Sequence, residues 1–420
     1  MTDKKTYDLV ILGGGPAGYV AAIRASQLGL RTACVEKDNV GGICLNWGCI
    51  PTKALLKSAE VFHLISNVDK YGISAENIKF DIEKIIKRSR DVSKKLTKGV
   101  NYLLKKNKVD LIKGHGKIGG PNKLLVDQNN KVIELGANNI ILATGARSRN
   151  LENIKSDGVN IWNYKHAMLP DKLPSSILVI GSGAIGVEFA TFYNAFNVDV
   201  TIVELQNRIL PVEDEEVSDF AKKIFKKSGI DIHCGSNIEN FKINKSSISA
   251  SIVSKENKIS KEFDKVILAV GIQGNVEDIG LETVSKIKIN KSHIEVDEFY
   301  RTGQDNIFAI GDVVGPPWLA HKAMHEAIIC VEKIANIKNI NPLDSSNIPG
   351  CTYSIPQIAS IGLTESQAKV NGYDIKVGRF PFKANGKAIA LGEEEGFIKT
   401  IFDSSTGELI GAHMIGTDVT

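Results

Sequence analysis

Two cysteines, Cys44 and Cys49, are separated by four residues in the segment GGICLNWGCIPTK at residues 41–53. On a regular α-helix, two residues five positions apart have Cα atoms roughly 8 to 9 Å apart, which exceeds the reach of a disulfide. The three glycines of the segment give the backbone the freedom to depart from a helix. We therefore predict a distorted backbone that lets the two sulfurs act as a pair.

Cys49 is predicted to stand near the N-terminus of a helix, because Pro51 suits a first helical turn and the pattern continues through Lys53 to Phe62. The positive end of a helix dipole stabilises a thiolate and makes it a better leaving or donor group. The pair is thus predicted to be reactive. Metal binding is the alternative, but zinc takes about four ligands. The neighbouring sequence offers no second cysteine pair or histidine cluster.

A glycine pattern occurs twice, each time after an apolar strand pattern and before a helix pattern. The first copy follows YDLVIL at residues 7–12, and the second follows SILVI at residues 176–180. The glycines are Gly13, Gly15 and Gly18 in the first copy and Gly181, Gly183 and Gly186 in the second. The strand that follows each helix pattern ends in an acidic residue, Glu36 or Glu204, 23 positions after the first glycine in both copies. This matched spacing disfavours two unrelated turns.

Each copy is predicted to bind a dinucleotide. Glycine lets the backbone approach a pyrophosphate, and the helix N-terminus offers N–H groups and a positive dipole end. The terminal carboxylate can accept a hydrogen bond from a ribose 2′-hydroxyl but repels a 2′-phosphate. Glu204 therefore favours NAD over NADP, and Arg208, four residues further on, is the feature that would soften this preference.

The segment GGICLNWGCIPTKALL resembles the redox signature of the class I flavoprotein pyridine nucleotide-disulfide oxidoreductases, most closely in their dihydrolipoamide dehydrogenase branch. The resemblance continues through ATGAR at residues 143–147, GSGAIGVEFA at 181–190, NIFAIGDV at 306–313 and LAHKA at 319–323. It therefore covers the chain from its first residues to its last.

The resemblance implies an α/β fold. It predicts two Rossmann-like dinucleotide-binding domains of the three-layer ββα type and a partial α+β dimerisation domain. The implied divisions are an FAD-binding domain at residues 1–148, an NAD-binding domain at 149–270, a central segment completing the FAD domain at 271–341, and an incomplete interface domain at 342–420.

The resemblance also implies the site residues and their roles. Cys49 would face the flavin, Cys44 would exchange with substrate, and Lys53 and Glu188 would pair beside the flavin ring. The implied FAD-binding residues are Gly13, Gly15, Gly18, Glu36, Lys53, Gly116, Thr144, Gly145, Asp312 and Ala320. The implied NAD-binding residues are Gly181, Gly183, Gly186, Glu204 and Gly271. No metal site is expected.

The implied activity is the FAD-dependent oxidation of dihydrolipoamide to lipoamide with reduction of NAD⁺. The implied partners are the lipoyl domain of a 2-oxoacid dehydrogenase complex and, for a complete C-terminus, a second copy of the chain. Glutathione and mercuric reductases share the cysteine spacing, but they favour NADPH, which Glu204 opposes. A catalytically silent structural subunit, or a truncated flavoprotein that reduces only artificial acceptors, is the alternative from another class.

Two departures from the family pattern bear on this reading. Ile272 and Gly274 stand where an Arg and a Pro are usual, which puts the usual contacts there in doubt. The chain ends in GAHMIGTDVT, before the family's C-terminal His–Glu motif, so a truncated chain with depressed dihydrolipoamide turnover is expected. Among the remaining histidines, His413 is expected to pack in a core or interface, and His321 and His325 to be structural.

Composition excludes other classes. The 420 residues carry a formal net charge of only +4, with lysines scattered among acidic residues, so nucleic acid is not an expected partner. Apolar stretches are much shorter than the roughly 20 residues that span a bilayer, and no secretion signal is visible. The expectation is a cytoplasmic protein without a membrane partner.

Overall fold

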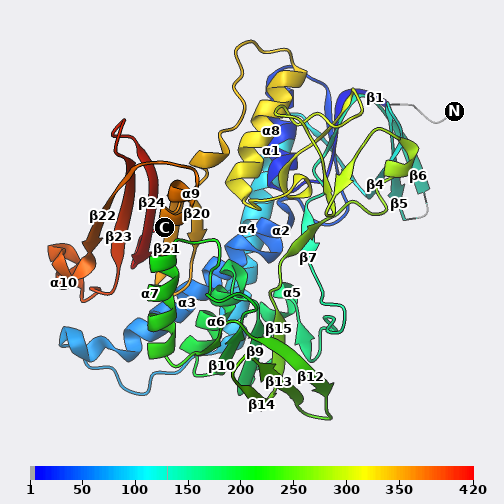
Figure 1. Cartoon of the computed structure of the whole chain (residues 1–420). Helices are drawn as coiled ribbons and strands as arrows, with labels where there is room; N and C mark the ends of the chain where they lie inside the picture. The colour runs from blue at the N-terminus through cyan, green and yellow to red at the C-terminus, as the bar shows by residue number, and fades with distance from the viewer. Residues whose placement is uncertain (1–4, 130) are drawn as a thin grey trace. The chain divides into compact units, whose positions relative to one another are not determined.

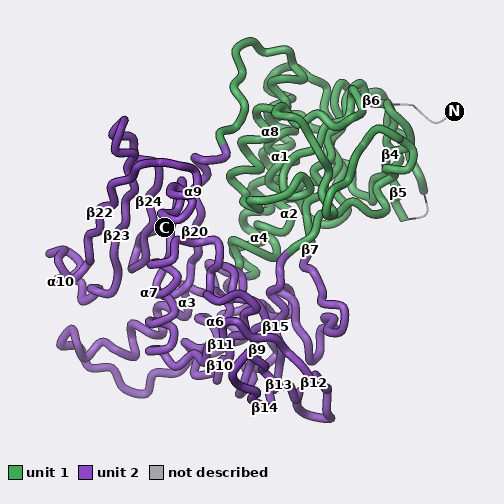
Figure 2. Tube along the Cα trace, in the orientation of Figure 1, with its two compact units in different colours: residues 1–51, 90–147, 272–344 green, residues 52–89, 148–271, 345–420 purple. Residues whose placement is uncertain are grey.

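The computed structural model describes residues 5–129 and 131–420, and the chain forms two compact units (Figure 2). The first unit comprises residues 1–51, 90–147 and 272–344, and the second comprises residues 52–89, 148–271 and 345–420. The four divisions expected from the sequence stay predictions, and each of the two units is assembled from three separate segments.

The first unit is built on a seven-stranded sheet (Figure 1). Its strands are β3 (Asp110–Lys113), β2 (Thr32–Glu36), β1 (Lys5–Leu12), β6 (Lys131–Leu142), β5 (Lys123–Gln128) and β4 (His115–Gly120), in that spatial order, with β19 (Ile307–Ala309) also paired to β6. Parallel pairing joins β3, β2, β1, β6 and β19, whereas β4 and β5 extend β6 as an antiparallel meander. The run Leu9–Ile11 is fully buried, as expected for a parallel strand that is covered on both faces.

Two helices of this unit, α1 (Pro16–Gln27) and α8 (Ala320–Ile334), pack side by side (Figure 1). The buried residues of α1 include Ala21, Ala22 and Ala25, and α8 contributes Ala327 and Cys330 to the same core. Small side chains let the two helix backbones approach closely. The apolar contact holds α1, the helix that follows the first glycine turn, against α8.

The second unit holds a five-stranded sheet that is parallel throughout, flanked by α6 (Ala184–Ala195) and α7 (Glu215–Lys227). Its spatial order is β11 (Asp231–His233), β10 (Asp199–Val203), β9 (Ser176–Ile180), β15 (Lys265–Leu268) and β8 (Ile161–Trp162). A separate antiparallel meander consists of β12 (Asn237–Ile243), β13 (Ile248–Val253) and β14 (Lys258–Phe263).

An antiparallel sheet of five strands ends the second unit, and we call it the interface sheet. Its order is β20 (Gly350–Thr352), β21 (Gln357–Gly362), β24 (Leu409–Gly416), β23 (Phe397–Asp403) and β22 (Ile375–Pro381). Ile358 and Ile415 of this sheet share one hydrophobic core with Phe225 of α7 and Val200 of β10. The interface sheet and the parallel sheet are therefore joined by a common core.

The remaining helices include the two that begin within the cysteine segment, α2 (Gly42–Trp47) and α3 (Cys49–Ser66). The others are α4 (Ile82–Lys106), α5 (Tyr164–Ala167), α9 (Glu365–Val370) and α10 (Gly386–Leu391), with short 3₁₀ turns η1 (Val68–Tyr71), η2 (Leu281–Thr283), η3 (Gly311–Val314), η4 (Ser345–Asn347) and η5 (Phe382–Ala384). Short strands are β7 (Ala146–Ser148), β16 (Ile272–Gly274), β17 (Ile289–Asn290) and β18 (His293–Ile294).

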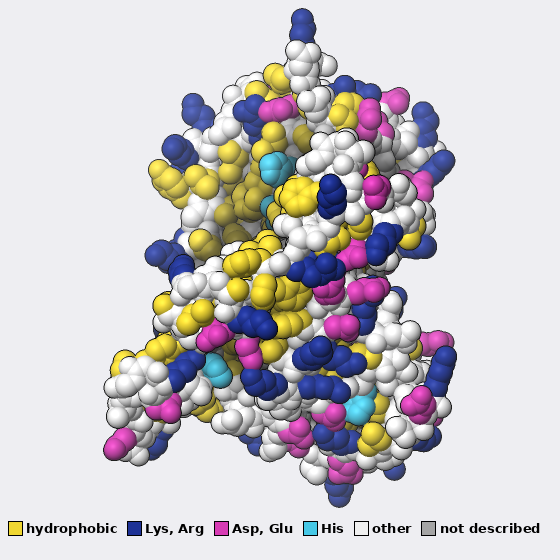
Figure 3. Space-filling view, turned by 60° about the vertical axis from the view of Figure 1, so that its left-hand side comes forward, with side chains coloured by type: hydrophobic (Ala, Val, Ile, Leu, Met, Phe, Trp, Pro, Cys, Tyr) yellow, Lys and Arg dark blue, Asp and Glu magenta, His cyan; other side chains and the backbone are white. Residues whose placement is uncertain are grey.

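The surface carries charges of both signs. On the face drawn in Figure 3, basic and acidic side chains lie interspersed rather than in separate fields. Across residues 5–129 and 131–420, no helix combines the length and apolar character needed to cross a membrane.

Candidate active site

The first glycine turn leads from β1 into α1. Gly13 has φ +108°, and a Cβ added to it would lie 2.2 Å from the Ala143 carbonyl oxygen. A Cβ at Gly18 would lie 1.8 Å from the carbonyl oxygen of Gly13. Neither position can hold a side chain without moving backbone. Gly15 is the N-cap residue of α1, and within the described chain no side chain caps this helix end.

The second glycine turn, between β9 and α6, repeats the first. Gly181 has φ +99°, and its added Cβ would lie 2.4 Å from the Ala269 carbonyl oxygen. At Gly186 the added Cβ would lie 2.1 Å from the Gly181 carbonyl oxygen. Gly183 is the N-cap residue of α6, again without a side-chain cap among the described residues. Both turns thus have the narrow backbone cradle and the uncapped helix start that a pyrophosphate requires.

The two acidic residues fold back onto these turns. Glu36 Oε2 accepts a hydrogen bond from the Gly14 N–H at 2.7 Å. Glu204 Oε2 accepts hydrogen bonds from the N–H and the hydroxyl of Ser182 at 2.9 and 2.7 Å. Each carboxylate therefore stands at the tip of its strand and against its turn, where a ribose would lie. Together with the cradles, this arrangement fits one dinucleotide on each turn.

The backbone between the cysteines is distorted as expected. Helix α2 ends at Trp47 and α3 begins at Cys49, with Gly48 between them at φ −144° and ψ −116°. The helix predicted to run through Lys53 to Phe62 extends further, from Cys49 itself to Ser66. The expectation that Cys49 lies near a helix N-terminus is therefore confirmed, and both cysteines are half-buried.

The cysteine segment packs directly on the first glycine turn. Gly42 has φ +57°, and a Cβ there would lie 2.7 Å from the Gly15 Cα. Cys44 packs against the same hydrophobic core as Tyr19 of α1. The redox signature and the first dinucleotide turn, which are 26 positions apart between Gly15 and Gly41 in sequence, are thus in contact through backbone and side chains.

Arg90 of α4 holds the residues between the two cysteines, and sequence reasoning missed it. Its guanidinium lies 4.7 Å from the ring centroid of Trp47, and Nη1 donates to the Asn46 carbonyl oxygen at 2.7 Å. Burial lowers the pKa of Arg90. Asn46 Oδ1 also accepts from the Thr97 hydroxyl at 3.1 Å. The available signal was the Asn–Trp dipeptide, which offers a polar and an aromatic partner within a reactive loop.

Lys53 and Glu188, expected as a pair, are both in contact with Tyr353. The Lys53 ammonium lies 3.5 Å from the centroid of the Tyr353 ring. Glu188 Oε1 accepts a hydrogen bond from the Tyr353 N–H at 2.8 Å. Burial raises the pKa of Glu188, while the Tyr353 N–H and the Lys53 ammonium act in the opposite direction. The direct pairing of Lys53 with Glu188 stays a prediction, and Tyr353 is a residue that sequence reasoning missed.

The other residues expected around FAD lie in the first unit. Thr144 and Asn275 bind each other reciprocally, Thr144 Oγ1 donating to the Asn275 carbonyl at 2.8 Å and Asn275 Nδ2 to the Thr144 carbonyl at 2.9 Å. Gly145 has φ +70°, and a Cβ at Gly116 would lie 2.5 Å from Leu12 Cδ1. These positions line the same end of the sheet as the first turn. Their FAD contacts stay a prediction.

Asp312 belongs to η3, and Ala320 is the first residue of α8. Burial raises the pKa of Asp312, and Lys322 opposes this shift. Lys322 is itself buried and forms an ion pair with Glu326 at 2.9 Å. The i, i+4 spacing of Lys322 and Glu326 was a visible signal that sequence reasoning did not use.

The two departures at Ile272 and Gly274 are accommodated without the usual residues. Arg147 Nη1 donates to the Gly274 carbonyl oxygen at 3.2 Å and to Asn275 Oδ1 at 3.0 Å. Arg147 also forms an ion pair with Glu277 at 2.8 Å. Arg147, the last residue of the ATGAR motif, therefore holds the backbone around Gly274 in place. Gly271 precedes this stretch and has φ +104°.

Of the three histidines considered in the sequence, His413 has the expected packing and the other two stay untested. His413 is 2% exposed in β24, where its Nε2 lies 2.9 Å from the Leu363 carbonyl oxygen, which confirms core packing. His321 and His325 lie in α8, and their structural role stays a prediction. Within residues 5–129 and 131–420, no group of three or more His, Cys, Asp or Glu side chains is arranged to hold a metal ion.

Two family profiles match this chain. The profile for "Pyridine nucleotide-disulphide oxidoreductase" matches residues 7–327, and that for the corresponding dimerisation domain matches residues 348–420. The expected fold class is therefore confirmed.

Curated relatives are similar over nearly the whole chain. A dihydrolipoyl dehydrogenase of Zymomonas mobilis is 52% identical over 99% of this chain and 89% of its own length. One from Rhizobium etli is 49% identical over 99% of this chain and 90% of its own length, and one from Bacillus subtilis is 42% identical over 99% and 89%. Because the match covers 99% of this chain, the expectation of a truncated chain is not borne out.

Solved structures agree with these relatives. The HOCl-induced flavoprotein disulfide reductase RclA from Escherichia coli superposes with a TM-score of 0.85 at 26% identity, over 98% of this chain and 90% of that one. LpdA from Mycobacterium tuberculosis reaches a TM-score of 0.90 at 24% identity over 98% and 90%, which is a likeness of fold. The sequence match, the dimerisation domain and the paired glycine turns agree, and the chain is an oxidoreductase that belongs to the pyridine nucleotide-disulphide oxidoreductase family.

Proposed function

We propose that this chain is a dihydrolipoyl dehydrogenase, which oxidises dihydrolipoamide to lipoamide and reduces NAD⁺ to NADH. The observation that carries the proposal is the cysteine pair at the break between α2 and α3, with its segment packed against Gly15 of the first turn. This arrangement brings a dithiol next to a dinucleotide-binding turn. The 52% identity with a dihydrolipoyl dehydrogenase supports the choice of substrate.

The proposed chemistry begins with thiol–disulfide exchange. A thiolate of the dihydrolipoyl group attacks Sγ of Cys44, the Cys44–Cys49 bond breaks, and Cys49 leaves as a thiolate. The second substrate thiol then attacks the mixed disulfide, closes the lipoamide ring and leaves Cys44 reduced. Two electrons are thereby held by the two cysteine sulfurs, and two protons are released. The start of α3 at Cys49 suits the leaving group, because a helix N-terminus favours a thiolate.

FAD and NAD are the proposed cofactors. The first turn, with Glu36, would hold the FAD, and Thr144, Gly145 and Asp312 would line its path. Bound FAD supplies a two-electron relay between dithiol chemistry and hydride transfer to NAD⁺. Lys53 and Glu188 would lie beside the flavin ring, and Tyr353 would keep the Lys53 ammonium and the Glu188 carboxylate in a fixed arrangement.

The second turn would hold NAD, with Glu204 accepting from the ribose 2′-hydroxyl. Glu204 is 7% exposed, and its Oε2 already accepts two hydrogen bonds from Ser182. An NADP 2′-phosphate would meet this buried carboxylate as a like charge. We therefore propose a preference for NAD(H), which separates this chain from NADPH-dependent disulfide reductases.

The proposed partners follow from the same function. The dimerisation profile at residues 348–420 supports a homodimer, and a lipoyl domain of a 2-oxoacid dehydrogenase complex is the proposed source of the dihydrolipoyl group. The molecular mass of the purified chain in solution tests the homodimer, and the same measurement after addition of an isolated lipoyl domain tests the second partner.

Two variants test the function. Purified chain is expected to carry FAD, to oxidise dihydrolipoamide with NAD⁺, and to reduce artificial acceptors with NADH. Cys44→Ser and Cys49→Ser are each expected to abolish dihydrolipoamide oxidation while NADH still reduces the flavin. Turnover of glutathione disulfide with NADPH in place of this activity, or purified chain without flavin, would overturn the proposal.

A further inference from the structure

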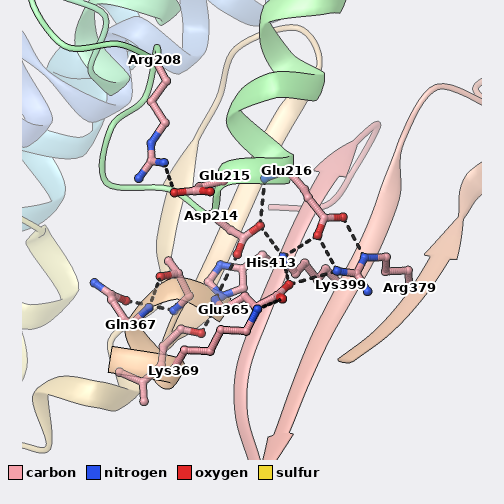
Figure 4. A network of polar contacts seen from close by, with 12 residues as sticks. Arg208, Asp214, Glu215, Glu216, Glu365, Gln367, Lys369, Arg379, Lys399 and His413 are labelled. Carbon is pink, nitrogen blue, oxygen red and sulfur yellow. Dashed lines mark hydrogen bonds and ion pairs between the residues drawn. The ribbon is translucent and has the colours of Figure 1, made fainter. Parts of the chain in front are cut away.

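Lys399 is a buried cation of the interface sheet. It stands on β23, its side chain is 2% exposed, and its ammonium faces three carboxylates (Figure 4). The distances from Nζ to oxygen atoms of Asp214, Glu216 and Glu365 are each 2.8 Å. Asp214 is as deeply buried as Lys399 itself, whereas the side chain of Glu216 is 40% exposed.

Two further cations complete the cluster. Arg379 donates to both Glu216 oxygens, at 2.6 and 2.8 Å, and to Glu365 at 3.0 Å. Lys369 donates to Glu365 at 2.7 Å. A buried ion pair is by itself weak evidence for a gain in stability, because removing the charges from water offsets their attraction. We therefore infer the role of Lys399 from the part of the chain that its ammonium holds in place, and not from a gain in stability.

The ammonium of Lys399 holds Asp214, which is the N-cap residue of α7. Asp214 Oδ1 accepts from the Glu216 N–H at 3.1 Å as well as from Lys399, and Oδ2 accepts from the Glu365 N–H at 3.2 Å. Helix α7 lies against the interface sheet, where the rings of Phe220 and Phe397 meet edge to face at 5.4 Å. Lys399 thus ties the first turn of α7 to β23.

Residues 205–213, which we call the β10–α7 loop, connect Asp214 to the second glycine turn. The Glu213 N–H donates to the Leu210 carbonyl at 2.9 Å, and the Leu210 N–H donates to the Ser182 carbonyl at 3.0 Å. The hydroxyl of Ser218 in α7 donates to the same Leu210 carbonyl at 3.1 Å. At its other end the loop follows Glu204, which also binds Ser182. The loop is therefore anchored to the turn by Leu210 and to the interface sheet through Asp214.

We propose that Lys399 is a positioning residue for the dinucleotide of the second turn: by holding Asp214, it fixes the β10–α7 loop and Ser182 in the conformation that accepts NAD(H). This inference rests on the proposed NAD site. Because coupling between two sites is reciprocal, a nucleotide bound on the turn should in return make the Lys399 cluster harder to open.

Lys399→Met tests the inference, and Arg379→Met is its matched control. Methionine keeps an unbranched side chain of similar length without the charge. Arg379 belongs to the same cluster and contacts Glu216 and Glu365, but within the described residues it has no hydrogen bond to Asp214, and its side chain is 45% exposed. Because both variants lose contacts to Glu216 and Glu365, an effect on nucleotide binding that is confined to Lys399→Met is assigned to the contact with Asp214.

Lys399→Met is expected to raise the Kd and the KM for NADH by about 5- to 20-fold, with kcat at saturating NADH nearly unchanged. Its FAD content should equal that of the unaltered chain. In nucleotide-free protein, amide hydrogen exchange should accelerate at residues 182 and 205–214. Arg379→Met should leave the NADH affinity and these exchange rates as they are. Lower thermal stability of Lys399→Met with unchanged NADH affinity and unchanged exchange would overturn the inference.

Asp214→Asn provides a second variant if Lys399→Met does not fold. Asparagine caps a helix about as well as aspartate, so α7 keeps its cap through Oδ1, while the charge that attracts Lys399 is removed and an amide nitrogen replaces Oδ2, the acceptor of the Glu365 N–H. Weaker NADH binding and faster exchange of the loop are expected, and wild-type values of both would overturn the inference. Failure of the unaltered chain to bind NADH at all would refute the proposed function, whereas the exchange measurement on nucleotide-free protein still decides the role of Lys399.

Discussion

The turn at Gly13 and the turn at Gly181 close with the same hydrogen bonds. The Gly13 N–H donates to the Val35 carbonyl at 2.8 Å, and the Gly181 N–H donates to the Val203 carbonyl at 2.9 Å. In both, the N–H that follows the first glycine donates to the acidic residue at the end of the next strand. The two regions differ in what surrounds these shared atoms.

The first turn is covered by the cysteine segment, whereas the described part of the chain places no such segment on the second. A Cβ at Gly15 would meet the Gly42 Cα at 3.8 Å, while a Cβ at the matching Gly183 would meet no atom of residues 5–129 and 131–420 within 4 Å. The first turn thus has backbone of its own chain packed on it. At the second turn, no described backbone packs in this way on the start of α6, and the turn is held by the hydrogen bond between the Leu210 N–H and the Ser182 carbonyl. On the proposed function, a covered turn suits a cofactor that stays bound, and an open turn suits one that leaves in every cycle.

The largest expected effect comes from filling each cradle with a methyl group. Gly18→Ala introduces a Cβ 1.8 Å from backbone, and Gly186→Ala introduces one 2.1 Å from backbone, so both turns must shift. Gly18→Ala should yield protein without FAD. Gly186→Ala should keep its FAD and lose reduction by NADH, as measured by absorbance under anaerobic conditions. Loss of flavin from both variants would mean that the two turns are not independent.

Replacing the acidic residues should sharpen the contrast in nucleotide choice. Glu204→Ala removes the buried charge beside the second turn, whereas Arg208 is ion-paired with Glu215 of α7. The ratio of kcat/KM for NADPH to that for NADH should rise roughly tenfold or more, since like-charge contacts cost several kcal/mol. Glu36→Ala is the matched variant, and it should weaken FAD retention without changing this ratio. An unchanged ratio in Glu204→Ala would remove Glu204 from the recognition of the ribose.

A smaller effect is expected from replacing Arg90, which supports the cysteine segment that packs on the first turn. Arg90→Met removes the hydrogen bond to the Asn46 carbonyl and the contact with the Trp47 ring. Dihydrolipoamide oxidation should fall roughly three- to tenfold, because the cysteines lose part of their fixed orientation. Reduction of the flavin by NADH should keep its rate. An equal loss in both half-reactions would indicate a general loss of stability instead.

The smallest effect is a pH dependence within the Lys399 cluster. The Arg379 guanidinium lowers the pKa of Glu216 from 4.5 to about 2, and Lys369, followed by Lys399, lowers that of Glu365 to about 2. A lowered folded-state pKa gives stability that is complete above about pH 4.5 and is lost as the pH falls through about 2. Thermal unfolding between pH 2 and 6 should show this loss, and Arg379→Met should show less of it. Equal slopes for the two proteins would contradict the assignment.

Local motifs allowed the dinucleotide turns and the cysteine helix start to be predicted, because glycine spacing and strand–helix alternation act within about 30 residues. The predicted helix after Cys49 was too short, since the helix runs on to Ser66; its residues Leu55, Leu56 and Ala59 are buried in the core. Arg90, Tyr353 and Lys399 were not predicted. Each acts on a partner more than 40 positions away in sequence, and a local pattern such as the Asn–Trp dipeptide does not say which distant residue will contact it.

The sequence by itself determined that the chain carries two dinucleotide turns with matched carboxylates and a helix that starts near Cys49, because these features depend on backbone freedom and helix polarity over short spans; the reactivity of the cysteine pair stays a prediction. Only the tertiary structure decided that Gly42 covers the first turn while the second stays open, and that Lys399 holds the loop behind it. The physical reason is that burial selects these partners: a buried ammonium or guanidinium must find acceptors, and the folded core determines which distant residues supply them.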